Sequence, residues 1–112
     1  MPLNIDFGKI LEQLKKDIVD LAKITMKGYV DEAKKDGLAF LKSTEDKLRR
    51  WTDLLINGDL TKEEFEWLLN SQKDLAVMAA LKEAGLAAIR VDQFKSSLLN
   101  LIADTVFHLI QV

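Results

Sequence analysis

Apolar residues recur along this chain at steps of three and four, which is the spacing of one face of an α-helix. In the first half they keep this spacing from Phe7 to Leu55, and no stretch alternates strictly as a half-buried strand would. The pattern predicts one long helix over about residues 5–57. The opposite face is polar and carries acid-before-base pairs four residues apart, such as Asp31 and Lys35, which stabilise an exposed helix surface.

A strong turn signal separates the two halves of the chain. Gly58 suits the left-handed conformation just past a helix end, where a residue with a Cβ atom is penalised. Thr61 and Glu64 have the spacing of a capping box, in which each side chain accepts a hydrogen bond from an amide at the start of the next helix. Leu60 and Phe65 occupy the two positions of a hydrophobic staple. Together these residues predict a tight turn between two helices.

Helical spacing resumes after this turn and no proline interrupts it, so the sequence predicts a second long helix over about residues 61–111. The predicted fold class is therefore all-α: a long antiparallel helical hairpin that makes a single domain of residues 1–112. Pairing the two helices about Gly58 places the small residues Gly28, Ala33 and Gly37 against an alanine-rich stretch at residues 79–88.

The glycines allow a second arrangement. If the chain breaks near Gly37 and Gly85, a single copy folds into a monomeric four-helix bundle. Neither glycine is followed by a capping signal like the one at Thr61, and a reversal normally needs a connection with turn chemistry. We therefore rank the long hairpin first and expect a kink rather than a reversal at these glycines.

In residues 96–112, apolar side chains cover much more than one face of the predicted helix. After Lys95 only Asp104 carries a charge at neutral pH. One helix of a hairpin covers only one stripe of the other, and leaving an apolar row in water is costly, at about 25 cal/mol per Å². We expect a second copy of the chain to cover it, giving a homodimeric four-helix bundle with coiled-coil packing. The expected interface residues are Leu98, Leu99, Ile102, Val106, Phe107, Leu109 and Ile110.

Composition narrows the function classes. The chain has 112 residues, no cysteine, one histidine and a formal net charge of −2. The absence of cysteine excludes a disulfide scaffold, a cysteine zinc site and a thiol nucleophile, and it fits a reducing compartment. A balanced charge argues against a dedicated nucleic-acid binder. The start of the chain lacks the basic and apolar regions of a signal peptide, so we expect a cytoplasmic protein with no membrane-spanning helix.

The sequence offers only weak candidates for a metal-binding or catalytic site. A twelve-residue calcium-loop register can be drawn from Asp53 to Glu64, but its third position is Leu55, which offers no oxygen, so a capped turn explains the same residues better. Asp104 and His108 lie one helical turn apart, and two ligands are too few for a metal site. We expect no catalytic residue, no metal site and no cofactor.

These observations predict a non-catalytic structural or protein-interaction module that acts as a homo-oligomer, with a dimer favoured and an unidentified protein as a further partner. The alternative is a peripheral amphipathic protein whose C-terminal helix lies on a lipid or other hydrophobic surface. The polar stripe of that helix lacks the lysines and arginines that attract anionic headgroups, so we rank this alternative second.

Overall fold

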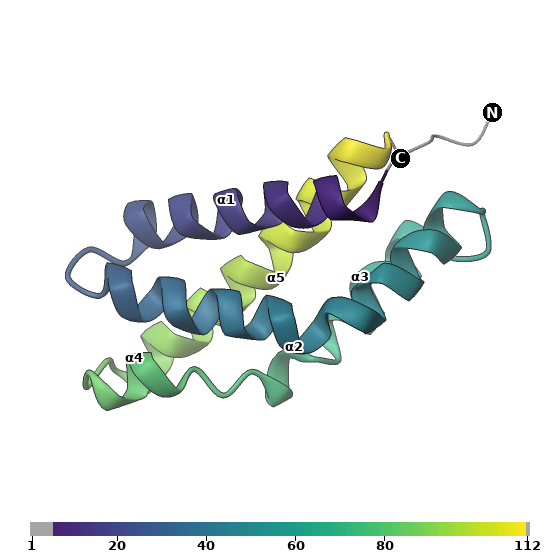
Figure 1. The fold of residues 1–112 in the computed structure, drawn as a ribbon. Helices are drawn as coiled ribbons and strands as arrows, with labels where there is room; N and C mark the ends of the chain where they lie inside the picture. Colours follow the sequence, from purple (N-terminus) through teal and green to yellow (C-terminus); the bar gives the residue numbers. More distant parts are fainter. Residues whose placement is uncertain (1–5, 112) are drawn as a thin grey trace.

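The computed structural model describes residues 6–111, which form five α-helices and one 3₁₀ turn, with no strand among them (Figure 1). This confirms the predicted all-α class. The predicted start of the first helix, at about Ile5, lies outside the described residues. In chain order the elements are α1 (Phe7–Thr25), α2 (Val30–Ile56), α3 (Lys62–Asn70), η1 (Lys73–Leu75), α4 (Ala79–Glu83) and α5 (Ala88–Ile110).

The first predicted helix, over residues 5–57, is in fact two helices that pack side by side. The α1 helix starts at its N-cap Asp6, whose carboxylate accepts a hydrogen bond from the amide of Gly8 at 3.0 Å. After α1 the chain reverses: Gly28 has a φ of +88°, a conformation that L side chains rarely adopt, and Tyr29 N donates to the carbonyl of Met26 at 2.8 Å. This reversal at Gly28, which the sequence did not predict, ends the first helix, and α2 returns along α1.

The second predicted helix, over residues 61–111, is interrupted twice. After α3 the chain passes through η1 and a non-helical stretch, residues 76–78, before the short helix α4. A second reversal follows at Gly85, whose φ is +86°. The alternative break near Gly85 is thus confirmed, and the uninterrupted helix is wrong.

The alternative break near Gly37 is wrong. Gly37 lies inside α2 and is buried. A Cβ atom at this position would lie 2.7 Å from Cγ2 of Ile18, closer than real Cβ contacts, and 3.8 Å from atoms of Phe94 and Leu98. Gly37 therefore allows α2 to approach α1 and α5 closely, and it does not end a helix.

The turn at Gly58 has the predicted geometry. Asp59 N donates to Leu54 O at 2.9 Å and Gly58 N to Leu55 O at 3.2 Å, which is the hydrogen-bond pair of a Schellman motif at the end of α2. Thr61 and Glu64 form the predicted capping box, with each side chain bonded to the other residue's amide at 3.1 and 3.0 Å. Phe65 is fully buried and Leu60 packs against the core.

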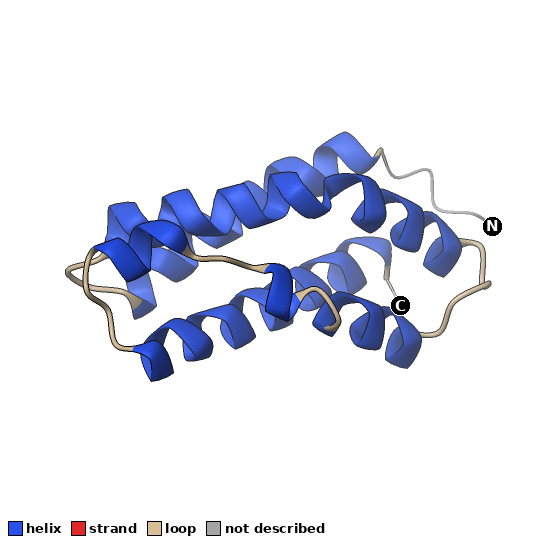
Figure 2. Cartoon of the chain, turned by 90° about the horizontal axis from the view of Figure 1, so that it is seen from below, coloured by secondary structure: helices blue, strands red, loops and turns tan. Residues whose placement is uncertain are grey.

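The core lies between α1, α2 and α5 (Figures 1 and 2). Helices α3 and α4 both pack against α2 and α5. Figure 2 shows the chain between α3 and α4 running across the face of the molecule as a loop with one short turn. The molecule measures 48 × 23 × 19 Å, shorter than the roughly 75 Å that an unbroken helix of about fifty residues would reach.

Candidate interaction surface

The apolar rows of α5 are inside the single chain. Of the seven residues expected at an interface, six are buried and Leu109 is half-buried. Ile102 and Val106 have no exposed surface, and the Phe107 ring lies 5.4 Å from that of Phe65 on α3, centroid to centroid. One chain therefore covers the rows that we expected a second copy to cover, because its breaks bring α1 and α3 onto α5. Contact of this face with lipid would also require α5 to leave the core.

The large apolar side chains that remain exposed lie elsewhere. Among the described residues there are five, each with between 65% and 75% of its surface exposed, and none is one of the seven residues expected at the α5 interface. Three fall within residues 67–77 and two at the end of the molecule where α1 ends and α5 begins. They are Trp67, Leu75 and Val77, and then Ile24 and Ile89.

Leu75 and Val77 are exposed on either side of the buried residue Ala76. Leu75 ends η1 and Val77 lies in the non-helical stretch 76–78, whose other two residues, Ala76 and Met78, are buried. Both exposed residues line a surface hollow of about 240 Å³ between this stretch and α2. Its lining comes from α2 and from the stretch 76–78 with its flanking residues: Asp36, Ala39, Phe40, Ser43, Leu75, Ala76, Val77, Met78 and Ala79.

A buried carboxylate holds α4 against α2. Asp36 is only 7% exposed, and its two oxygens accept hydrogen bonds from Ala80 N at 3.0 Å and Leu81 N at 2.7 Å. These are the second and third amides of α4, whose N-cap residue, Met78, makes no side-chain cap hydrogen bond. Helix-start amides need an acceptor, and here the acceptor comes from a residue 44 positions earlier. The sequence offers no local signal of this contact, and our sequence analysis missed it.

The contact agrees with the register of a hairpin about Gly58. Asp36 meets Ala80, and farther toward the turn Lys47 donates to the side-chain oxygen of Gln72 at 3.1 Å. The part of the chain after the turn thus lies opposite α2 as predicted, although it is not one helix. The small-against-small expectation is not met: Ala80 and Ala84 share a surface hollow with Asp31, Glu32 and Lys35 of α2, and Gly37 faces Ile18.

The structure does not bring the candidate metal-binding side chains together. The residues of the calcium-loop register at Thr61 and Glu64 are used by the capping box, and Leu55 is buried. Asp104 and His108 are both exposed. Within residues 6–111, no group of three or more His, Asp or Glu side chains is placed to hold a metal ion.

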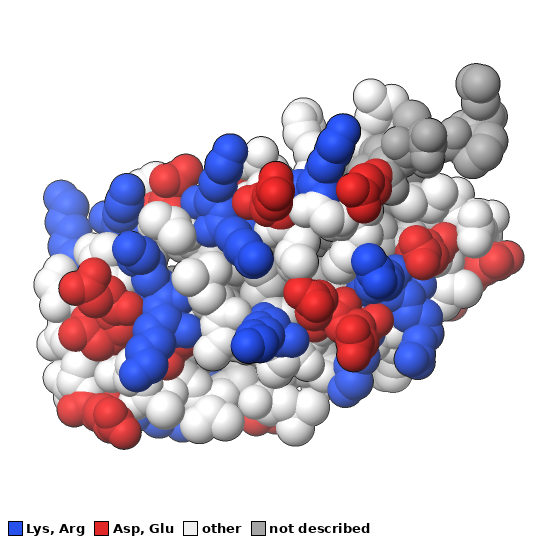
Figure 3. All heavy atoms as spheres, in the orientation of Figure 1, with Lys and Arg blue, Asp and Glu red and all other residues white. Residues whose placement is uncertain are grey.

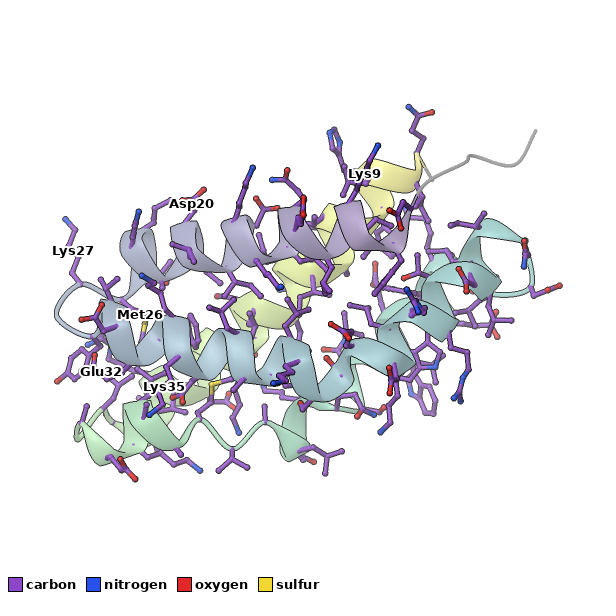
Figure 4. The ribbon with its side chains drawn as sticks, in the orientation of Figure 1. Lys9, Asp20, Met26, Lys27, Glu32 and Lys35 are labelled. Carbon is purple, nitrogen blue, oxygen red and sulfur yellow. The ribbon has the colours of Figure 1, made fainter. Side chains whose placement is uncertain are left out.

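On the face shown in Figure 3, basic and acidic side chains are interspersed. Figure 4 shows Lys9, Asp20 and Lys27 pointing away from the helices.

Thr52 is the buried polar group without a partner. It is 1% exposed, and its hydroxyl has no hydrogen-bond partner among the described residues. Replacing it in Thr52→Val keeps the shape and removes the unpaired hydroxyl, so we expect the free energy of unfolding to rise by about 1 kcal/mol in urea denaturation. Thr44→Val is the control, since the Thr44 hydroxyl is also buried but donates to Phe40 O at 2.9 Å. A loss of stability in Thr52→Val would contradict the unpaired hydroxyl.

Among the described residues, no helix is both long enough and apolar enough to cross a membrane. No protein-family model, no curated protein and no solved structure matches this chain.

Proposed function

We propose that this protein is a non-catalytic helical interaction module that acts as a homo-oligomer. The observation that carries the proposal is the exposed apolar pair Leu75 and Val77 beside the hollow on α2. Both side chains line this hollow and lie largely in solvent, and covering exposed aliphatic groups with a partner lowers the free energy.

A second copy of the chain supplies a fitting partner. The hollow is lined by apolar groups of Phe40, Ala76 and Met78, and its size suits an aliphatic side chain. In a two-fold symmetric dimer, the same patch meets itself, so Leu75 of each copy enters the hollow of the other. The net charge of −2 adds little repulsion between two copies. This interface replaces the one expected on α5, whose apolar rows are occupied by the core.

The non-catalytic part of the proposal rests on the separation of the reactive side chains. The histidine at position 108 is exposed on the surface of α5, and the buried carboxylate of Asp36 already accepts two backbone hydrogen bonds. General acid–base catalysis needs such groups to converge in a pocket that a substrate can enter. The hollow beside Leu75 contains no histidine and only the one, occupied, carboxylate.

The oligomeric state tests this proposal. We expect light scattering coupled to size exclusion to give a mass near twice 12.7 kDa for the wild-type chain, falling toward 12.7 kDa on dilution. In Leu75→Ser/Val77→Ser the mass should be 12.7 kDa at concentrations where the wild type is a dimer, because the apolar contact is lost.

The matched control is Ile24→Ser/Ile89→Ser, which removes two aliphatic side chains of similar exposure at another place on the molecule. This variant should keep the wild-type mass. A wild-type mass of 12.7 kDa at every concentration would overturn the homo-oligomer, and equal effects of the two double variants would overturn the interface at Leu75 and Val77.

A further inference from the structure

We infer that residues 71–87, which we call the strap, open away from the rest of the fold as a unit while α1, α2 and α5 stay folded. We also infer that the hydrogen bonds to Asp36 hold the strap in its closed position. The strap contains η1, the non-helical stretch 76–78, α4 and the turn at Gly85. This inference does not rest on the proposed homo-oligomer, because it concerns an opening within one chain.

The strap is weakly built from its own residues. Its two helical pieces have three and five residues, too short for a helix that is stable without outside support. Five of its side chains are buried, and most of the rest are exposed. The buried ones are Gln72, Ala76, Met78, Leu81 and Leu86. Few buried apolar groups and many exposed residues are the marks of a segment that opens before the whole protein unfolds.

The backbone of the strap carries strain at one position. Met78 has a φ of +53° and a ψ of 45°, the left-handed region, which is costly for a residue with a Cβ atom. Its side chain is buried, so the anchoring of the strap and the strained conformation coincide at one residue. Opening the strap relieves this strain, which lowers the free-energy difference between the closed and open forms.

The polar contacts that oppose the opening are few. The ion pair between Lys73 and Asp92, at 3.1 Å, has side chains that are 29% and 64% exposed, so solvent weakens it. The hydrogen bond from Lys47 to Gln72 joins one flexible side chain to another. At the two ends of the strap, Ser71 and Gln72 donate to backbone carbonyls of α3, and the carbonyl of Ala87 accepts from the first turn of α5. Between these ends, the buried carboxylate of Asp36 accepts two hydrogen bonds from backbone amides of α4, and bonds to a carboxylate are the stronger kind.

Opening has a consequence for the surface of the molecule. When the strap leaves, Met78 and Leu81 lose their cover and the side of Phe40 that lines the hollow is exposed. The closed form therefore hides apolar surface on α2 that the open form presents, with Asp36 at the boundary between the two.

Native-state hydrogen exchange at increasing, sub-denaturing urea concentrations tests the inference. The probes are the hydrogen-bonded amides of Leu81, Lys82, Ala84 and Leu86, compared with core amides of α1 and α5. In the wild type we expect the strap amides to exchange through an opening with a smaller urea dependence than that of the α1 and α5 amides. If all of these amides share one urea dependence and one exchange free energy, the strap does not open separately and the inference is overturned.

The Asp36→Asn variant tests whether the hydrogen bonds to Asp36 hold the strap closed. Asparagine keeps the size of the side chain but offers one acceptor oxygen where two amides need one each. We expect exchange of the strap amides to become at least about tenfold faster, with the α1 and α5 amides unchanged at low urea. The matched control is Asp92→Asn, which removes the exposed ion pair from the same strap and should leave its exchange within about twofold of wild type.

Two outcomes would overturn the role of Asp36. One is that Asp36→Asn and Asp92→Asn accelerate exchange equally. The other is that Asp36→Asn accelerates every core amide together or fails to fold, which would make Asp36 part of the global fold. The wild-type urea series needs no variant and decides separately whether the strap opens by itself.

Discussion

An aspartate in place of Ile102 is expected to unfold the protein. Ile102 lies in the middle of α5 with no exposed surface, packed within the core of a single chain. A carboxylate there loses its hydration and finds no partner, a change that costs more than about 4 kcal/mol and so removes most of the stability of a small domain. Far-UV circular dichroism should show Ile102→Asp without a cooperative thermal transition, or with most of its helicity lost.

The control for this variant is Ile89→Asp in the first turn of the same helix. Ile89 is 69% exposed, so a charge there stays hydrated and should change the free energy of unfolding by less than about 0.5 kcal/mol. If Ile102→Asp instead stays folded and merely turns a dimer into a monomer, the apolar row of α5 is an intermolecular interface and its burial in one chain is refuted.

A valine at Gly37 is expected to cost about 3 kcal/mol or more. A Cβ atom at Gly37 meets Cγ2 of Ile18 at 2.7 Å, and Ile18 is fully buried and branched at Cβ, so it has no free rotamer to move into. Gly37→Ala should already lose about 1–2 kcal/mol, even though alanine favours a helix over glycine by about 1 kcal/mol. Urea denaturation with a linear extrapolation measures both variants.

A double variant separates overpacking from other causes. Ile18→Ala by itself should cost about 2–5 kcal/mol because it leaves a cavity. In the Ile18→Ala/Gly37→Ala variant the added Cβ fills space that Ile18 has vacated, so the total loss should be smaller than the sum of the two single losses. Gly8→Ala is the control: its Cβ would approach no atom closer than 3.4 Å, so it should be neutral or slightly stabilising. A Gly37→Ala variant as stable as wild type would refute the close approach.

The turn at Gly58 shows how far local sequence information reaches. The Schellman hydrogen bonds, the capping box of Thr61 and Glu64 and the burial of Phe65 all follow from residues within a few positions of each other. Their chemistry is local, so the sequence predicts them with their partners. The same reasoning predicts the helical class, because apolar periodicity is a property of the chain by itself.

The reversal at Gly28, which we did not expect, and the one at Gly85, which we ranked second, have no such local chemistry. The N-cap residues of α2 and α5 are Tyr29 and Ala87, and neither makes a side-chain cap hydrogen bond. The glycines at 28 and 85 permit a reversal, as Gly37 also would, and all three look alike in the sequence. What distinguishes them is the space around them: nothing lies within 4 Å of a Cβ at Gly28 or Gly85, whereas one at Gly37 meets Ile18.

The helical class and the capped turn at Gly58 could be read from the sequence, because each follows from spacing or from neighbouring side chains. The fold as a whole sets where the two halves break, which apolar residues stay in solvent and which amides bond to Asp36. The apolar rows of α5 needed a cover in either arrangement, and breaking the chain at Gly28 and in residues 71–87 let one copy provide it. The free energy of burying apolar surface is a sum over the whole fold. No local sequence pattern therefore shows whether a second copy or the rest of the same chain covers α5 at the lower free energy.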